Sequence, residues 1–112
     1  MLPKSNRLRS GAEFTRVTKT GHRASSSNLV IYGALENNQT PKIGFIVNRS
    51  VGGSVTRHLV TRKLRHDLAS HISKLPKNTM LVVRVLKEQK DYRVEVSSSI
   101  EKIISKLTKV DA

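Results

Sequence analysis

Residues 43–68 read IGFIVNRSVGGSVTRHLVTRKLRHDL, and this stretch decides both the fold and the candidate site. An apolar run of strand length ends at Asn48–Arg49, a Gly-Gly-Ser turn follows, and then the pattern becomes helical. Four apolar residues of the helical part recur at spacings of four and seven, namely Val60, Leu64, Leu68 and Leu75. This periodicity predicts a helix over Val55–Leu75 that carries a basic face beside its apolar one.

On the N-terminal side, Ser10 and Glu13 have the spacing of a capping box, which predicts a helix over Gly11–Lys19 that ends at Gly21. The β-rich segment Asn28–Tyr32 predicts a strand. A polar turn separates it from Lys42–Asn48, so we expect these two segments to pair as a hairpin.

On the C-terminal side, Thr79–Leu86 is a nearly continuous apolar run, which predicts a buried central strand. The spacing of Ile100, Ile103, Ile104 and Leu107 predicts a last helix over Val96–Leu107, capped by Ser98 or Ser99. The order helix, two or three strands, helix, strand, helix favours an α+β sandwich with one sheet. The crossover helix is right-handed by default.

The composition points to a polyanionic partner. The 112 residues favour one domain over 1–112, with residues 1–9 as a flexible basic arm, and the net charge is +13. Residues 1–77 hold 14 Lys and Arg residues but only 3 acids, so anion binding should concentrate there. Each cation that meets a phosphate releases condensed counterions, which makes nucleic acid the natural ligand.

Several other classes are excluded by the sequence. Without cysteine, disulfides and thiolate metal sites are excluded. No apolar run approaches the ~20 residues of a membrane span, and the N-terminus lacks an apolar signal core. We therefore expect a soluble, cytoplasmic protein without a membrane partner.

The candidate RNA- or DNA-binding surface combines the end of the strand, the glycine turn and the basic helix face. Its residues are Arg49, Gly52, Gly53, Arg57, His58, Arg62, Lys63 and Arg65. Arg57 lies in the first helical turn, where free N–H groups already favour an anion. The alternative is an ordinary solvated basic face.

Catalysis by this chain alone is not expected. Gly52-Gly53-Ser54 lacks the spacing of a nucleotide-binding loop. Of the four histidines, His58 and His66 share the basic stripe, but neither has a fixed carboxylate partner in the sequence, and the eight acids are scattered. A nuclease would need an acid–base pair or a carboxylate cluster for Mg²⁺. We therefore assign no catalytic residue and no metal site.

Phe14 and Tyr32 are two of only four aromatic residues. Phe14 either packs in the core or, with Tyr32, offers a wall on which unpaired bases stack. We expect Tyr32 on a strand next to Arg49.

Five segments have an order and spacing known from one family: Asn6-Arg7-Leu8, Glu13-Phe14 with Val17, Leu29–Tyr32, Ile43-Gly44-Phe45 with Val47, and the segment from Arg49 to Arg65. Through these segments the chain resembles, over nearly its whole length, the protein subunit of bacterial ribonuclease P. The Arg-rich helix departs from the usual Arg-Asn-Arg-x-Lys-Arg core at His58, Leu59 and Thr61, and Thr18 stands where a second aromatic is common.

The resemblance implies a sheet of about four strands with three helices, in the order α-β-β-β-α-β-α, with a left-handed crossover that overrides the default. It implies that an RNA subunit, with Mg²⁺, hydrolyses precursor tRNA to remove its 5′ leader. The protein would bind the catalytic RNA and precursor tRNA and need no obligate protein partner. Phe14, Tyr32, Arg49 and Arg57 would border the leader, and Arg62, Lys63 and Arg65 would face the catalytic RNA. A structural ribosome-associated RNA-binding protein remains the alternative.

Overall fold

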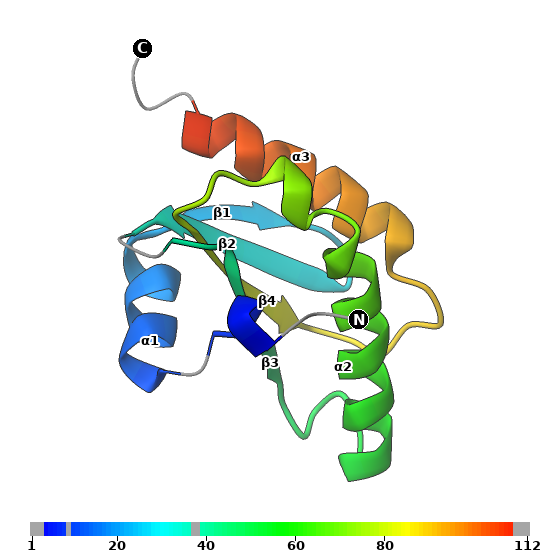
Figure 1. The fold of residues 1–112 in the computed structure, drawn as a ribbon. Coiled ribbons are helices and arrows are strands. Elements are labelled where there is room, and N and C mark those ends of the chain that lie inside the picture. The colour runs from blue at the N-terminus through cyan, green and yellow to red at the C-terminus, as the bar shows by residue number, and fades with distance from the viewer. Residues whose placement is uncertain (1–3, 9, 37–38, 109–112) are drawn as a thin grey trace.

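The computed structural model describes residues 4–8, 10–36 and 39–108, in which three α-helices lie against a four-stranded sheet (Figure 1). The elements are α1 (Gly11–Thr20), β1 (His22–Ser25), β2 (Leu29–Leu35), β3 (Lys42–Val47), α2 (Ser54–Ala69), β4 (Thr79–Val85) and α3 (Arg93–Thr108). Two 3₁₀ helices, Lys4–Asn6 and Ile72–Lys74, complete the set. The predicted α+β class and the predicted order of elements are confirmed.

The strand order in the sheet is β1-β2-β4-β3. β2 is antiparallel to both of its neighbours, whereas β3 and β4 are parallel. The predicted hairpin between Asn28–Tyr32 and Lys42–Asn48 is therefore wrong, because β4 lies between these strands. In β4 only Arg84 is exposed, and a strand that is apolar on both faces is most stable at the centre of a sheet. The predicted central strand is confirmed, and β3 becomes an edge strand.

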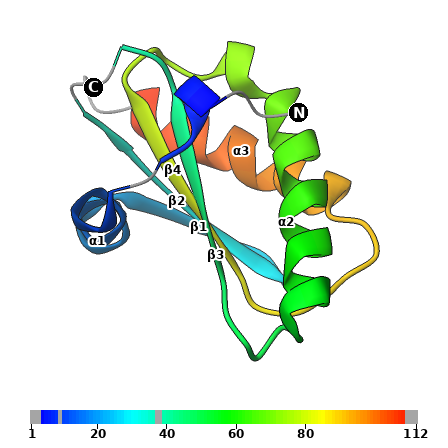
Figure 2. The same cartoon turned by 60° about the horizontal axis from the view of Figure 1, so that its bottom comes forward.

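The two faces of the sheet are covered unequally (Figure 2). Helices α2 and α3 pack on one face and form the main core, with Leu64, Leu68 and Ile103 fully buried. Helix α1 packs on the other face through a smaller cluster that includes Val17 and Val82. Because α2 joins the parallel neighbours β3 and β4, it is a crossover connection, as expected. The hand of the crossover stays a prediction.

The limits of α1 agree with the predicted caps. The N–H of Glu13 donates to Ser10 Oγ (3.4 Å), and the N–H of Gly21 donates to the Val17 carbonyl (2.9 Å). Gly21 has an ordinary negative φ of −79°. Glycine is needed there because a Cβ would lie 2.7 Å from the Gly33 carbonyl oxygen on β2.

Helix α2 ends six residues earlier than predicted, at Ala69. The N–H of His71 donates to the Leu68 carbonyl, and the chain then forms the 3₁₀ turn Ile72–Lys74. Leu75 still packs in the main core, which explains why it keeps the apolar spacing of the helix.

Helix α3 begins earlier than predicted, at Arg93, so Ser98 and Ser99 lie inside it and do not cap it. Asp91 Oδ1 instead accepts the N–H of Arg93 (2.9 Å), the first residue of the helix. Tyr92 precedes the helix and is fully buried, and its hydroxyl donates to the Lys87 carbonyl (2.8 Å).

Residues 4–8 were expected to belong to a flexible arm, but they pack along β3. Asn6 Nδ2 donates to the Pro41 carbonyl (2.7 Å), and the N–H of Leu8 donates to the Ile43 carbonyl (3.0 Å). Arg7 forms a parallel bridge with Ile43, and Leu8 is buried. Burial of Leu8 against the α1 cluster explains the docking.

Candidate nucleic-acid interface

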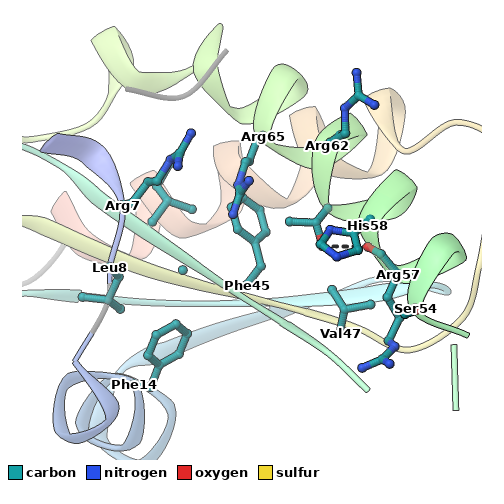
Figure 3. Close-up of a pocket in the computed structure, with 13 residues that line it drawn as sticks. Arg7, Leu8, Phe14, Phe45, Val47, Ser54, Arg57, His58, Arg62 and Arg65 are labelled. Carbon is teal, nitrogen blue, oxygen red and sulfur yellow. Dashed lines mark hydrogen bonds between the residues drawn. The ribbon is translucent and has the colours of Figure 1, made fainter. Parts of the chain in front are cut away.

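A cavity of about 550 Å³ opens beside the edge strand β3 (Figure 3). Helix α2 forms one wall, and α1 with the N-terminal segment forms the other. Four arginines and one histidine line it: Arg7, Arg57, His58, Arg62 and Arg65. None of the lining residues is an Asp or a Glu. The cavity therefore has the electrostatic character of an anion-binding site.

Arg57 and Arg65 lie about two turns apart on α2. The Nε atom of each is buried and has no hydrogen-bond partner among the described residues. A buried N–H group without an acceptor costs about 1–3 kcal/mol. An anion in the cavity would remove that cost, because its oxygens accept charge-assisted hydrogen bonds from guanidinium groups.

The pKa of Arg65 reflects its burial and the cation beside it. Burial lowers the pKa of Arg65, and the like charge of Arg7 lowers it further. Arg7 reaches the cavity because the segment around it is bonded to Ile43 on β3. Arg7 was not among the residues predicted to bind RNA. Its position directly before an apolar residue that docks in the core was the signal available.

Apart from Ser54 and Thr61, the rest of the cavity wall is apolar and aromatic. Phe14 comes from α1, whereas Phe45 and Val47 come from β3. Phe14 is partly buried and packs with the α1 cluster, so it serves the core and the cavity together. Phe45 was not among the predicted residues. Successive residues on a strand point to opposite faces of the sheet. Because Gly44 lies on the α1 side, Phe45 lies on the α2 side, and this alternation was the signal available in the sequence.

Five predicted residues line this cavity: Phe14, Arg57, His58, Arg62 and Arg65. Arg49, Gly52 and Gly53 belong to the loop between Val47 and Ser54, whose two ends both line the cavity. The N–H of Gly52 donates to the Arg49 carbonyl (3.1 Å), and Arg49 is exposed at this loop.

Tyr32 and Lys63 lie elsewhere. Tyr32 is on β2, on the α1 side of the sheet, and β4 separates its strand from β3. The expectation that Tyr32 lies on a strand next to Arg49 is therefore wrong. Lys63 lies on the other side of α2, where its Nζ donates to the Lys90 carbonyl (3.2 Å).

Lys63 lines a second cavity of about 710 Å³, between α2 and the segment before α3. Arg62 lines both cavities, and exposed Leu59 lies at this one. Acids distinguish the second cavity from the first. Asp91 pairs with Arg93 (2.9 Å), and that hydrogen-bonded pair lowers the pKa of Asp91.

The described residues contain no group of three or more His, Asp or Glu side chains placed to hold a metal ion. Arg16–Glu36 and Arg93–Asp91 are ion pairs among these residues, and neither pair includes a histidine. His71 has a buried Nδ1 without a partner, but it lies beyond the C-terminal end of α2, away from the cavity. Within the same ranges, no helix combines the length and apolar character that crossing a bilayer requires.

The fold and the cavity define an α+β protein with a cationic cavity that no carboxylate lines. The chain belongs to the ribonuclease P protein family, because the family model described as Ribonuclease P matches residues 2–108. The Ribonuclease P protein component of a Nocardioides species is 42% identical over 77% of this chain and 76% of its own length. That of Acidothermus cellulolyticus is 32% identical over 96% and 92%.

Solved structures share the fold. The ribonuclease P protein of Staphylococcus aureus matches with a TM-score of 0.70 at 20% identity, over 91% of this chain and 94% of that one. The protein from Thermotoga maritima matches with a TM-score of 0.68 at 19% identity, over 90% and 96%. The family expected from the sequence is confirmed: the chain is a protein component of the RNA–protein endoribonuclease ribonuclease P.

Proposed function

We propose that this chain binds the catalytic RNA of ribonuclease P and precursor tRNA, and that the cavity beside β3 holds the unpaired 5′ leader. The observation that carries the proposal is the pair of buried Nε atoms of Arg57 and Arg65, two residues that line a cavity without carboxylates. Phosphate oxygens of an RNA strand are acceptors of the kind that these donors lack.

The apolar wall supports a single strand as the ligand. Phe14 and Phe45 offer ring surfaces on which bases can stack, and a base must be unpaired to reach them. Arg49 lies on the loop at the end of the cavity and adds a further positive charge there. Gly52 and Gly53 lie on the same loop, where the absence of a side chain lets the RNA approach the backbone. A duplex, whose bases are already stacked, would use only the arginines.

The opposite side of α2 carries cations of its own, beside Asp67 and Asp91. Lys63 and His66 face away from the first cavity, and Arg62 borders both cavities. We assign this side to the catalytic RNA and the cavity side to the leader. Arg65, expected to face the catalytic RNA, is assigned to the leader because it lines the first cavity. Tyr32 is not assigned to this cavity.

The hydrolysis itself is assigned to the RNA subunit, with Mg²⁺ as its metal ion. The chain contributes binding and orientation, which lower the concentration of Mg²⁺ needed by neutralising phosphates that would otherwise repel one another. In this role the chain acts as a single domain in the cytoplasm and needs no further protein.

The test is cleavage of precursor tRNA by the catalytic RNA at low Mg²⁺, with and without this chain. Wild-type protein should restore cleavage, and a variant with both Arg57→Gln and Arg65→Gln should restore much less. Lys102→Gln, an exposed cation on α3 outside both cavities, is the matched control for loss of charge. Absence of rescue by wild-type protein would favour a structural, ribosome-associated role.

A free-standing nuclease is the second outcome to test. Protein purified free of RNA should not cleave precursor tRNA. Cleavage that persists without RNA and disappears with His58→Ala would place the chemistry on this chain and contradict the proposal.

A further inference from the structure

Asp67 on α2 lines the second cavity, and the fold gives its carboxylate no hydrogen-bond donor. Among the residues that the structure describes, none donates a hydrogen bond to the Asp67 side chain or forms an ion pair with it. Burial raises the pKa of Asp67, and the like charge of Asp91 raises it further, while His66, Arg93 and His71 offset this only in part. Asp91, by contrast, accepts hydrogen bonds on both oxygens from Arg93 (2.9–3.1 Å). A ligand with N–H donors would therefore relieve Asp67 rather than Asp91.

Two hydrogen bonds hold the walls of the second cavity in place. Lys63 Nζ donates to the Lys90 carbonyl (3.2 Å), which joins α2 to the loop that follows β4. The hydroxyl of buried Tyr92 donates to the Lys87 carbonyl (2.8 Å), which closes that loop. Because these contacts already order the walls, a ligand would bind with little cost in conformational entropy.

The residues that line the second cavity define the chemistry of a ligand. Arg62, Lys63 and Lys90 supply positive charge, and the Leu59 side chain, 50% exposed, supplies apolar surface. A bare anion would pair with the cations but would be repelled by Asp67. The ligand must therefore carry a phosphate, a flat ring and N–H donors together. A nucleotide whose base is unpaired carries all three.

The carboxylate of Asp67 distinguishes among the four bases. An ionised carboxylate only accepts hydrogen bonds, and its two oxygens can accept two of them in parallel. Guanine presents two adjacent donors on its Watson–Crick edge, namely N1–H and the 2-amino group. Uracil presents one N–H there, and adenine and cytosine each present an amino group beside an acceptor. Guanine is therefore the base that a single carboxylate binds best, provided that this edge is not already paired.

We propose that the second cavity binds an unpaired guanine of RNA, with the Asp67 carboxylate accepting from N1–H and the 2-amino group while Arg62 and Lys63 contact the flanking phosphates. This inference rests on the proposed function, which assigns this side of α2 to the catalytic RNA. Contacts to phosphate position an RNA but do not read its sequence. Asp67 thus adds base specificity to a surface whose cations alone would bind any RNA.

The test measures Kd by fluorescence anisotropy for the full chain, without catalytic RNA, and the hexaribonucleotides UUGUUU, UUAUUU and UUIUUU, where I is inosine. Wild-type protein should bind UUGUUU about five- to tenfold more tightly than UUAUUU, as expected for one bidentate base contact. Adenine controls for the stacking of a purine. Inosine keeps N1–H but lacks the 2-amino group, so UUIUUU should fall between the two. Because this comparison needs no substitution, it does not depend on the stability of a variant.

The same preference should persist in the variant with both Arg57→Gln and Arg65→Gln, because these residues line the first cavity and not the second. Equal binding of UUGUUU and UUAUUU by wild-type protein and by this variant would overturn the guanine site. It would leave the proposed function standing if the wild-type chain still rescued cleavage at low Mg²⁺. A wild-type chain that bound none of the three RNAs would contradict the proposed function as well.

Asp67→Asn separates base recognition from charge, because it removes a negative charge beside the RNA. If charge alone governed binding, this variant would bind all three RNAs more tightly than wild-type protein. A guanine site requires instead that the Kd for UUGUUU rise to the value for UUAUUU. Glu101→Gln, an exposed acid on α3 outside both cavities, is the matched control and should keep the preference. Circular dichroism checks that both variants are folded, and a folded Asp67→Asn variant that still prefers UUGUUU would refute the role of Asp67.

Discussion

The ring of Phe14 on α1 occupies the space that a side chain at Gly44 on β3 would take. Leu8 borders the same position, where its Cβ would be 3.1 Å from a Cβ on residue 44. One glycine on the edge strand thus sets how closely α1 approaches the sheet and where the aromatic wall of the cavity lies.

Gly44→Ala should therefore destabilise the fold. The added methyl group overlaps the Phe14 ring, and overpacking of this kind costs about 1–3 kcal/mol of unfolding free energy. Urea denaturation measures the loss. Gly11→Ala is the matched control, because nothing lies within 4 Å of a Cβ there and alanine favours the helix. A Gly44→Ala variant as stable as Gly11→Ala would mean that Phe14 moves aside freely.

Arg62→Ala and Arg65→Ala should each weaken RNA binding and flatten its salt dependence. Removal of one phosphate contact lowers the log–log salt slope by about 0.7–0.9. The loss of affinity should be larger for Arg65, whose Nε is buried, than for exposed Arg62. Binding isotherms across a salt series give both values. An unchanged slope in either variant would show that its guanidinium does not contact phosphate.

Phe14→Leu should weaken binding of leader-bearing precursor tRNA more than binding of mature tRNA. Leucine keeps much of the apolar contact with Leu8 but removes the flat ring on which a base can stack. Phe14→Ala should show the same preference with an added loss of stability of about 3 kcal/mol. Competition binding of the two RNAs by the holoenzyme measures the ratio. Equal losses for both RNAs would mean that Phe14 only packs in the core and does not contact the leader.

The free energy of unfolding should fall in acid, because ionised Glu95 stabilises the fold. Its carboxylate accepts hydrogen bonds from Ser26 Oγ (2.7 Å), from the N–H of Asn28 (2.9 Å) and from Asn28 Nδ2 (2.9 Å), which ties α3 to the β1–β2 turn. Burial works to raise the pKa of Glu95, but the hydrogen bonds from Asn28 and Ser26 together outweigh it and hold the pKa below its usual value.

Because the pKa of Glu95 is lower in the folded state, its contribution to stability is complete above the unfolded pKa and is lost as pH falls through the folded one. Glu95→Gln should cost about 1–3 kcal/mol at neutral pH and remove that part of the acid dependence. Thermal unfolding across the acidic range gives the comparison. Glu101→Gln, on the exposed side of α3, is the control. The idea fails if both variants show the same pH profile.

Local patterns predicted most of the fold. Ser10 and Gly21 marked the limits of α1, and the apolar run of β4 marked a central strand, because these features act through neighbouring residues. The pairing of β3 was missed, since which strands become neighbours depends on packing across the whole sheet. The end of α2 was missed because Leu75 keeps helical spacing while packing from a separate turn.

The candidate site was predicted only in part, because tertiary packing decides which residues line the cavity. Helical spacing placed Arg57, Arg62 and Arg65 near one another, but it could not assign them to the two sides of α2. Arg7 and Phe45 reach the cavity through tertiary contacts of β3, which leave little trace in local sequence.

The bonds between residues 6–8 and β3 have one more effect. An edge strand with free N–H and C=O groups is a template for pairing with another molecule. The bridge between Arg7 and Ile43, with the adjoining bond from Leu8, occupies part of that template. The same short segment that supplies a cavity arginine therefore also covers part of the open edge of the sheet, so a change in this segment would alter the charge of the cavity and uncover the edge strand at the same time.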